Sequence, residues 1–254
     1  MNVTGEQSTE RKIADFVSQQ PIREALDYLI DSLPEGAVIY LVGGAIRNLI
    51  IEVFHGRSPP IDDIDLFVSV VSDDFHLAEI LPDDRFIITD IGGVRWRPAR
   101  STYDIDICLL QDFIIIKKYH LAPVLQNLIG AIDFTMNTVV YDICNQKLYE
   151  RNALADIQKR LLAFNTRKLY TKTAIAYRTL LLRYKTGFAL SQDVFYFVKQ
   201  LIDLDTLMAV KQILSTRFGK DRMHVILDDY DRICSFCSFD DYSRHAPEAL
   251  AGDI

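Results

Sequence analysis

Cysteines and long apolar runs are scarce in this 254-residue sequence. No stretch of about 18 apolar residues occurs, as a membrane-spanning helix would need. The N-terminus is polar rather than a basic segment followed by an apolar one, which argues against a secretory signal. The four cysteines do not have the spacing of a disulfide framework. Cys234 and Cys237 form a single Cys-x-x-Cys pair, whereas a familiar zinc site needs a second pair of ligands. We therefore expect a reducing, cytoplasmic location and no membrane partner.

Positive charge is also in deficit, since the formal net charge is −7. This argues against a generally basic nucleic-acid-binding protein. Basic side chains are nevertheless concentrated in residues 95–185, which contain 15 Lys and Arg against 7 Asp and Glu. Such a segment could give a local positive field for a triphosphate or an RNA strand, and ordinary solvated faces would give the same count.

Hydrophobic periodicity predicts an α+β arrangement in the first part of the chain. With 49% hydrophobic residues and no internal repeat, the chain can build a globular core. The predicted elements are one or two helices within 9–33, a strand at 37–42, a helix at 45–54, strands at 63–70 and 102–110, and weaker strands at 86–91 and 94–97. The segment 134–141 has a mixed pattern.

The rest of the chain has the pattern of helices alone. Residues 170–184 repeat apolar side chains at spacings of three and four and stop before Gly187. Further helices are predicted at 191–201, where Ser191 can cap, 204–216 and 221–233. We expect an α/β domain over residues 1–165, a helical domain over 166–242 and a disordered tail over 243–254.

Two aspartates, Asp63 and Asp65, flank Ile64 in the strand predicted at 63–70. Because side chains in a strand alternate between faces, both carboxylates project to the same side, about 7 Å apart. Mg²⁺ prefers carboxylate, water and phosphate oxygens, and two such ions stabilise the attacking and leaving oxygens of a phosphoryl transfer. The pair therefore suits a two-metal site, although Asp-x-Asp by itself is more often a solvated strand or turn.

Gly43 and Gly44 stand between the predicted strand 37–42 and the predicted helix 45–54. Glycine lets a backbone approach a ligand closely, and a helix N-terminus offers unpaired N–H groups and a positive dipole end to a phosphate. This order of elements favours a triphosphate at the glycines with its metal ions on the aspartates. A tight turn is the simpler interpretation of Gly-Gly alone.

Three stretches together resemble the polymerase-β-type nucleotidyltransferases, and within them the tRNA nucleotidyltransferases (CCA-adding enzymes) and bacterial poly(A) polymerases. The first is Leu41-Val-Gly-Gly-Ala-Ile-Arg-Asn48 with Asp62-Asp-Ile-Asp-Leu66, similar to the family's Gly-Gly-x-Val-Arg-Asp and Asp-x-Asp motifs. The second is Asp133-Phe-Thr-Met-Asn137 with Tyr141-Asp142. The third is Ala155-Asp-Ile-Gln-Lys-Arg-Leu161 with residues 178–188, which resemble the end of the head and the first neck helix.

The resemblance implies a polymerase-β-like head, with a mixed sheet and helices, followed by a small neck-like helical domain. It implies that Asp63 and Asp65 hold two Mg²⁺ ions and that Gly43, Gly44 and Arg47 contact the triphosphate. Asp133 and Asn137 of the second stretch are also predicted to bind the nucleotide, and Arg178 could contact a base or a phosphate or form a salt bridge with a neighbouring acid. The expected partners are a nucleoside triphosphate and an RNA acceptor. The expected reaction is transfer of a nucleotide to an acceptor hydroxyl, such as an RNA 3′ end, with release of pyrophosphate.

The resemblance also implies a third carboxylate on a neighbouring strand. Asp104 and Asp106 alternate with apolar residues and therefore share one strand face. Alignment with the family's Tyr-Glu segment favours Asp104, whereas the apolar-Asp-apolar pattern favours Asp106, and the spacing leaves both open. A nearby cluster suits phosphate contact and base stacking, or a soluble hairpin edge, and comprises Arg95, Trp96, Arg97 and Arg100.

Several positions depart from the family pattern. Asn48 replaces the Asp that usually ends the first motif, and Ala131-Ile132 replaces Arg-Arg before Asp133. The base-reading Glu-Asp-x-x-Arg motif would fall at Thr171-Lys-Thr-Ala-Ile175, where none of its defining residues is present, and little chain remains for a tRNA-binding body. We therefore expect the metal chemistry without faithful CTP-then-ATP addition. The alternatives are nucleotidylation of a protein or small molecule, and a catalytically silent nucleotide- or RNA-binding protein.

Overall fold

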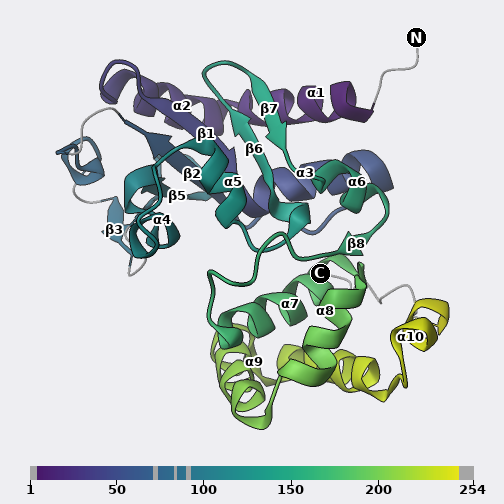
Figure 1. Ribbon diagram of the computed structural model, residues 1–254. Helices are drawn as coiled ribbons and strands as arrows, with labels where there is room; N and C mark the ends of the chain where they lie inside the picture. The colour runs from purple at the N-terminus through teal and green to yellow at the C-terminus, as the bar shows by residue number, and fades with distance from the viewer. Residues whose placement is uncertain (1–4, 71–73, 83–84, 90–92, 246–254) are drawn as a thin grey trace. The chain divides into compact units, whose positions relative to one another are not determined.

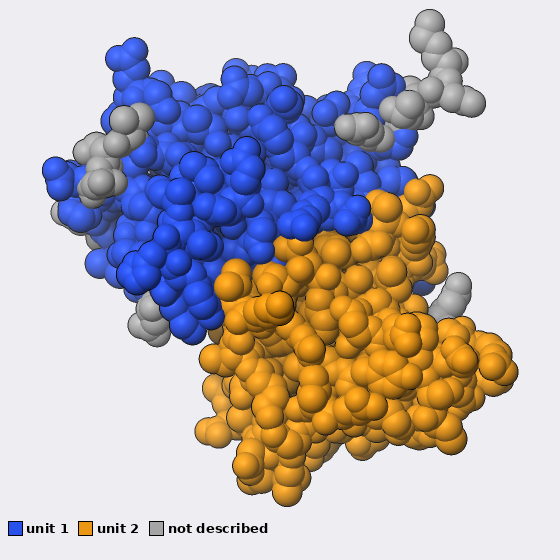
Figure 2. All heavy atoms as spheres, in the orientation of Figure 1, with its two compact units in different colours: residues 1–132, 137–154 blue, residues 133–136, 155–254 orange. Residues whose placement is uncertain are grey.

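The computed structural model describes residues 5–70, 74–82, 85–89 and 93–245. The chain divides into two compact units, residues 1–132 with 137–154 and residues 133–136 with 155–254 (Figures 1 and 2). The division thus falls at residue 154 rather than 165, and one short segment of the first part of the chain belongs to the second unit. Among the described helices, none has the length and apolar content that a membrane span requires.

The first unit is built on a seven-stranded mixed sheet with the order β3-β4-β5-β2-β1-β6-β7. Its strands are β1 Val38–Val42, β2 Asp63–Ser69, β3 Phe86–Ile88, β4 Val94–Trp96, β5 Asp104–Leu109, β6 Val139–Asp142 and β7 Lys147–Glu150. Of the strand pairs described in this sheet, β2–β5 is parallel and the others are antiparallel. The predicted strands are therefore confirmed, although β3 is shorter than expected, and residues 90–91 lie outside the described residues.

Strict alternation of side chains gives the central strands two different faces. Ile64, Leu66 and Val68 of β2 are buried, while the intervening residues are half-buried. The same alternation in β5 buries Ile105 and Ile107. Aspartates in both strands therefore fall on the face opposite the buried aliphatic side chains.

Helices complete the core of the first unit (Figure 1). α3 (Gly43–His55) packs against β1, β2 and β6, and α1 (Gly5–Val17) packs against α3, while α2 (Gln20–Ser32) follows α1. α3 begins at the two glycines, so the expected glycine turn is the first turn of the helix itself. Shorter elements follow β2 and β5, namely η1 Leu77–Glu79, η2 Leu110–Asp112, α4 Ile114–Lys118 and α5 Leu125–Ala131. They are followed by η3 Thr135–Asn137, which begins in the segment 133–136 of the second unit.

The second unit is mainly helical, as predicted. It contains α7 (Lys172–Thr186), α8 (Gln192–Tyr196), the π-helix η4 (Phe197–Leu201), α9 (Leu204–Ser235) and α10 (Phe239–His245). The strands β8 (Leu161–Leu162) and β9 (Ala189–Leu190) form a two-stranded sheet. α6 (Ala153–Gln158) precedes β8. α7 packs against α9 and ends at Gly187, whose φ of 70° is the left-handed conformation that favours glycine. α9 contains both helices predicted at 204–216 and 221–233, joined by Gly219 with non-helical dihedral angles.

Two local expectations differ from the structure. Ser191 occupies the N-cap position of α8, but its hydroxyl donates to the Asp193 carboxylate and makes no capping bond to the backbone. Residues 243–245, at the start of the expected disordered tail, form the end of α10, because Tyr242 is buried and anchors this short helix. The rest of that expected tail, 246–254, lies outside the described residues.

Candidate active site

Four carboxylates lie in register on one face of the parallel β2–β5 pair. Asp63 pairs with Asp104 and Asp65 with Asp106. Because adjacent strands lie about 4.8 Å apart, the pairing makes two short rows of like charge across the sheet. The structure thus brings together the two aspartates predicted to hold metal and both candidates for the third carboxylate.

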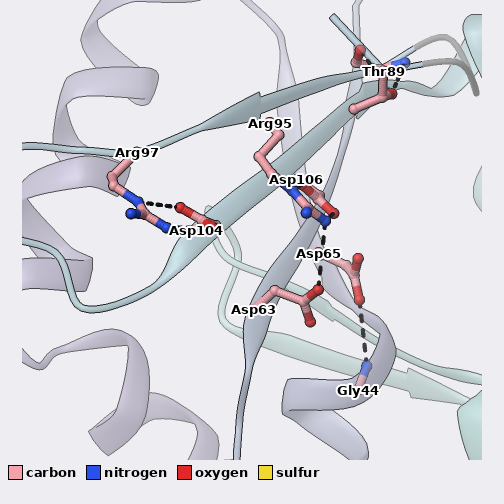
Figure 3. A network of polar contacts seen from close by, with 9 residues as sticks. Gly44, Asp63, Asp65, Thr89, Arg95, Arg97, Asp104 and Asp106 are labelled. Atoms are coloured by element: carbon pink, nitrogen blue, oxygen red, sulfur yellow. Dashed lines mark hydrogen bonds and ion pairs between the residues drawn. The ribbon is translucent and has the colours of Figure 1, made fainter. Parts of the chain in front are cut away.

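Asp65 lies directly against the first turn of α3 (Figure 3). The Gly44 N–H donates to Asp65 Oδ2 at 3.4 Å. Gly43 has a φ of +77°, and a Cβ added there would lie only 2.0 Å from Asp65 Oδ2. Gly43 is therefore needed both for its left-handed backbone and for the close approach of this carboxylate. The Asp65 carboxylate thus lies at the positive end of the α3 dipole.

Arg95 of β4 and Arg97, which directly follows β4, form ion pairs with the two aspartates of β5. Arg95 donates from Nε and Nη2 to the two oxygens of Asp106 at 2.7 and 2.6 Å, and its Nη2 lies 3.8 Å from Asp63 Oδ2. Arg97 donates in the same bidentate way to Asp104 at 2.5 and 2.7 Å. These hydrogen bonds lower the pKa of the Asp104 carboxyl and raise the pKa of Arg95. Both β5 carboxylates are therefore paired with guanidinium groups.

Trp96 does not take part in the site. It alternates with Arg95 and Arg97, so it points to the opposite face of β4, where it is only 4% exposed and packs against Tyr28 with ring centroids 5.6 Å apart. The expectation that this aromatic ring could stack on a base was wrong, because the strand alternation that exposes the arginines buries the tryptophan.

Arg47 and Asn48 brace the first turns of α3 against two other segments. The buried Arg47 donates from Nη1 to Asn137 Oδ1 at 3.0 Å and from Nε and Nη2 to Asn48 Oδ1 at 3.0 and 2.9 Å. Asn48 Nδ2 in turn donates to the carbonyl oxygens of Pro59 and Pro60 at 3.1 and 2.9 Å. An aspartate at position 48 could not donate these two bonds, so the amide has a structural reason: it holds the loop that leads into β2.

The second unit holds the other two residues predicted to bind nucleotide. Asp133 is 1% exposed, accepts a hydrogen bond from the Phe134 N–H at 2.9 Å, and forms an ion pair with Arg178 of α7. Burial, followed by the charge of Asp133, raises the pKa of the nearby Tyr170. The Arg178 side chain is 44% exposed and therefore remains partly accessible to solvent.

The positions aligned with the family's base-reading motif have structural roles in this chain. Thr171 caps α7 by accepting from the Ala174 N–H at 3.2 Å, and Lys172 forms an ion pair with Asp203. Ile175 is 1% exposed and belongs to the core of the second unit. None of these three side chains resembles the carboxylate and guanidinium groups of the family motif.

The donor set of the carboxylate face suits Mg²⁺ in kind. Carboxylate oxygens are the ligands that this ion prefers, and Asp63 and Asp65 point to one side of β2. In the part of the chain that the structure describes, however, no group of three His, Cys, Asp or Glu side chains is arranged to hold a metal ion. Asp104 and Asp106 form ion pairs with Arg97 and Arg95 instead.

Comparison with known proteins gives no match to a family model or to a curated protein sequence. Solved structures do match. A CCA-adding enzyme of Bacillus stearothermophilus in complex with CTP is 21% identical, with a TM-score of 0.55 over 82% of this chain and 52% of that chain. Another CCA-adding enzyme with CTP is 14% identical, with a TM-score of 0.64 over 89% and 54%.

A third match is the Thermotoga maritima CCA-adding enzyme complexed with tRNA, at 13% identity and a TM-score of 0.56 over 82% of this chain and 53% of that one. This chain therefore spans about half the length of the solved structures that it matches. At these identities the likeness concerns the fold. The chain has the polymerase-β-like fold seen in CCA-adding enzymes, with a head of mixed sheet and helices and a helical neck, which confirms the resemblance predicted from its motifs.

Proposed function

We propose that this protein is a nucleotidyltransferase that transfers a nucleotide from a nucleoside triphosphate to an acceptor hydroxyl, with an RNA 3′ end as the favoured acceptor. The observation that carries the proposal is the placement of Asp63 and Asp65 on one face of β2, with Asp65 against the N-terminus of α3. The likeness to structures of CCA-adding enzymes with CTP and with tRNA supports it.

In this proposal, some residues of the first unit bind the metal ions and the triphosphate, and others hold these binding residues in position. Asp63 and Asp65 would hold two Mg²⁺ ions, whose charge would stabilise the transferred phosphate and the leaving pyrophosphate. The N-terminus of α3 at Gly44 would receive triphosphate oxygens, since helix N-termini bind phosphate. Arg47 is buried among Asn48 and Asn137, so its proposed role is to position this first turn.

Asp106 is the better candidate for the third carboxylate. It stands in register with Asp65 and shares the guanidinium of Arg95 with Asp63. Asp104 instead turns toward Arg97, away from the other carboxylates (Figure 3). Asp106 would accept or orient the proton of the attacking hydroxyl.

Nucleotide choice is proposed to differ from that of a CCA-adding enzyme. The base-reading positions 171–175 are used for a helix cap, an ion pair and the core. In the second unit, Arg178 has a partly exposed guanidinium that would bind a phosphate, and the buried Asp133 would hold it in place through their ion pair. The excess of basic residues over 95–185 favours a polyanionic acceptor such as RNA.

The test is incubation of the purified protein with each of the four labelled nucleoside triphosphates, Mg²⁺ and total RNA. Asp63→Ala should abolish labelling of RNA, whereas Asp27→Ala, which removes an exposed carboxylate on α2, should leave it unchanged. Labelling of a protein or small molecule in a lysate, in place of RNA, would support the transferase activity but show that the acceptor is not RNA. If no triphosphate gives a labelled product, the proposal is overturned.

A further inference from the structure

The site carboxylates already have a cation of their own, the guanidinium of Arg95. This group bonds both oxygens of Asp106 and lies 3.8 Å from Asp63, so it connects strands β5 and β2 (Figure 3). The registers put Arg95 opposite Asp106 and Asp106 opposite Asp65, which makes one row across β4, β5 and β2. A cation in this row faces the carboxylates that a metal ion would need.

We propose that Arg95 occupies the metal-site carboxylates in the nucleotide-free protein, and that metal binding transfers its guanidinium from Asp106 and Asp63 to the triphosphate. This inference rests on the proposed nucleotidyltransferase function. It concerns a residue outside the three motifs that carry the family resemblance.

Charge and geometry make the two cations alternatives. Mg²⁺ binds carboxylate oxygens at about 2.0–2.1 Å and demands near-octahedral geometry. Each oxygen of Asp106 already accepts a hydrogen bond from the Arg95 fork, so an ion that binds this carboxylate would lie close to the positive charge of the guanidinium and be repelled by it. Asp63, Asp65 and Asp106 are like charges on one face of the sheet, so a cation close to them is favourable.

Arg95 is also able to move. Its side chain is 44% exposed, so the guanidinium can leave the carboxylates on the solvent side without crossing the core. A planar fork that binds a carboxylate with two parallel bonds can bind a phosphate in the same way. Once released, the group would remain on the face of the sheet that the triphosphate has to approach.

Arg97 provides a matched control within the same molecule. It makes the same bidentate pair with Asp104 and carries the same charge, but its side chain is 71% exposed and has no contact with Asp63 or Asp65 among the described ion pairs. Substituting either arginine by glutamine removes one positive charge from the same end of the sheet. A difference in metal affinity between the two variants therefore reflects the contacts of Arg95 with Asp106 and Asp63 rather than the change in net charge.

The primary measurement is binding of Mn²⁺ to the nucleotide-free protein, followed by the electron paramagnetic resonance signal of the free ion. We expect Arg95→Gln to bind Mn²⁺ roughly fivefold or more tightly than wild type, because a nearby positive charge that repels the ion is removed. Arg97→Gln should change the affinity by less than about twofold, since its charge is exposed and screened. Arg95→Lys, which keeps the charge without the bidentate fork, should fall between wild type and Arg95→Gln.

The second measurement is binding of inorganic triphosphate in the presence of Mg²⁺, where Arg95→Gln should bind more weakly than Arg97→Gln. Equal Mn²⁺ affinities for Arg95→Gln and Arg97→Gln would contradict the competition between Arg95 and the metal ion. Equal triphosphate affinities would contradict the transfer of the Arg95 guanidinium to the phosphate. Wild-type Mn²⁺ binding by Asp63→Asn would have a different meaning, because it would remove the metal site on which the proposed function depends. Thermal unfolding of each variant checks that it is folded.

Discussion

Replacement of Gly43 by alanine tests the closest contact in the site. The backbone there has a φ of +77°, which costs an L-residue roughly 1–2 kcal/mol. The added Cβ would lie 2.0 Å from Asp65 Oδ2, 2.8 Å from its Cγ and 3.0 Å from its Cβ. Rotation of the carboxylate alone does not relieve all three contacts, so β2 and α3 must separate locally.

The expected result is a larger loss of activity than of stability. To reach even a 3.0 Å separation, Asp65 Oδ2 must move about 1 Å away from the Cβ. A displacement of that size at a catalytic group typically lowers turnover about 10²-fold. Unfolding in urea should show a loss of roughly 1–3 kcal/mol, from the backbone strain and the imperfect repacking.

Gly44→Ala is the matched control. A Cβ at Gly44 meets only Arg47 Nη2, at 3.5 Å, which is ordinary van der Waals contact, and the N–H that donates to Asp65 is retained. Its stability and its affinity for Mn²⁺ should therefore stay close to wild type. If Gly43→Ala keeps Mn²⁺ affinity and turnover within about twofold of wild type, the close packing of Asp65 against α3 has no functional role.

Four further outcomes are expected. Asp63→Ala should abolish transfer with little loss of stability, which turnover and urea unfolding would measure together; wild-type turnover would exclude Asp63 from the site. Asp106→Asn should lower turnover roughly 10²-fold and Asp104→Asn far less, and the reverse order in parallel assays would assign the third carboxylate to Asp104. Asn48→Asp should destabilise the protein by about 1–3 kcal/mol in urea, because two carbonyl groups lose their donor, and a more stable variant would contradict this role. Nucleotide selectivity should be altered or relaxed, given the roles of 171–175, so strict CTP-then-ATP addition to a tRNA lacking its 3′ end would be the contrary result.

The succession of elements could be predicted because the signals for it are local. A β-branched run before Gly43, helical spacing after it and alternation around Asp63 each depend on a few neighbouring residues. The same holds for α7, whose end at Gly187 follows from the left-handed conformation there. The common face of Asp63 and Asp65 likewise needs only the two-residue period of a strand.

The partners of these residues depend on contacts between distant segments, which no local pattern contains. Asp106 meets Arg95 because β4 and β5 pair in one particular register, and a slip of one residue would put Trp96 on the carboxylate face. The need for glycine at position 43 comes from Asp65, 22 residues later in the chain. The amide of Asn48 is explained only by the two carbonyl groups of the following loop.

The order of strands along the chain has a consequence for how this site can change. The hairpin β3–β4 lies in sequence between β2 and β5, yet it adds to the outer side of β5 and leaves the parallel pair uninterrupted. Substitutions of the basic residues in this hairpin are therefore expected to leave the register of the two acidic strands unchanged. The carboxylates of the site and the cations beside them thus come from strands that can vary separately in sequence.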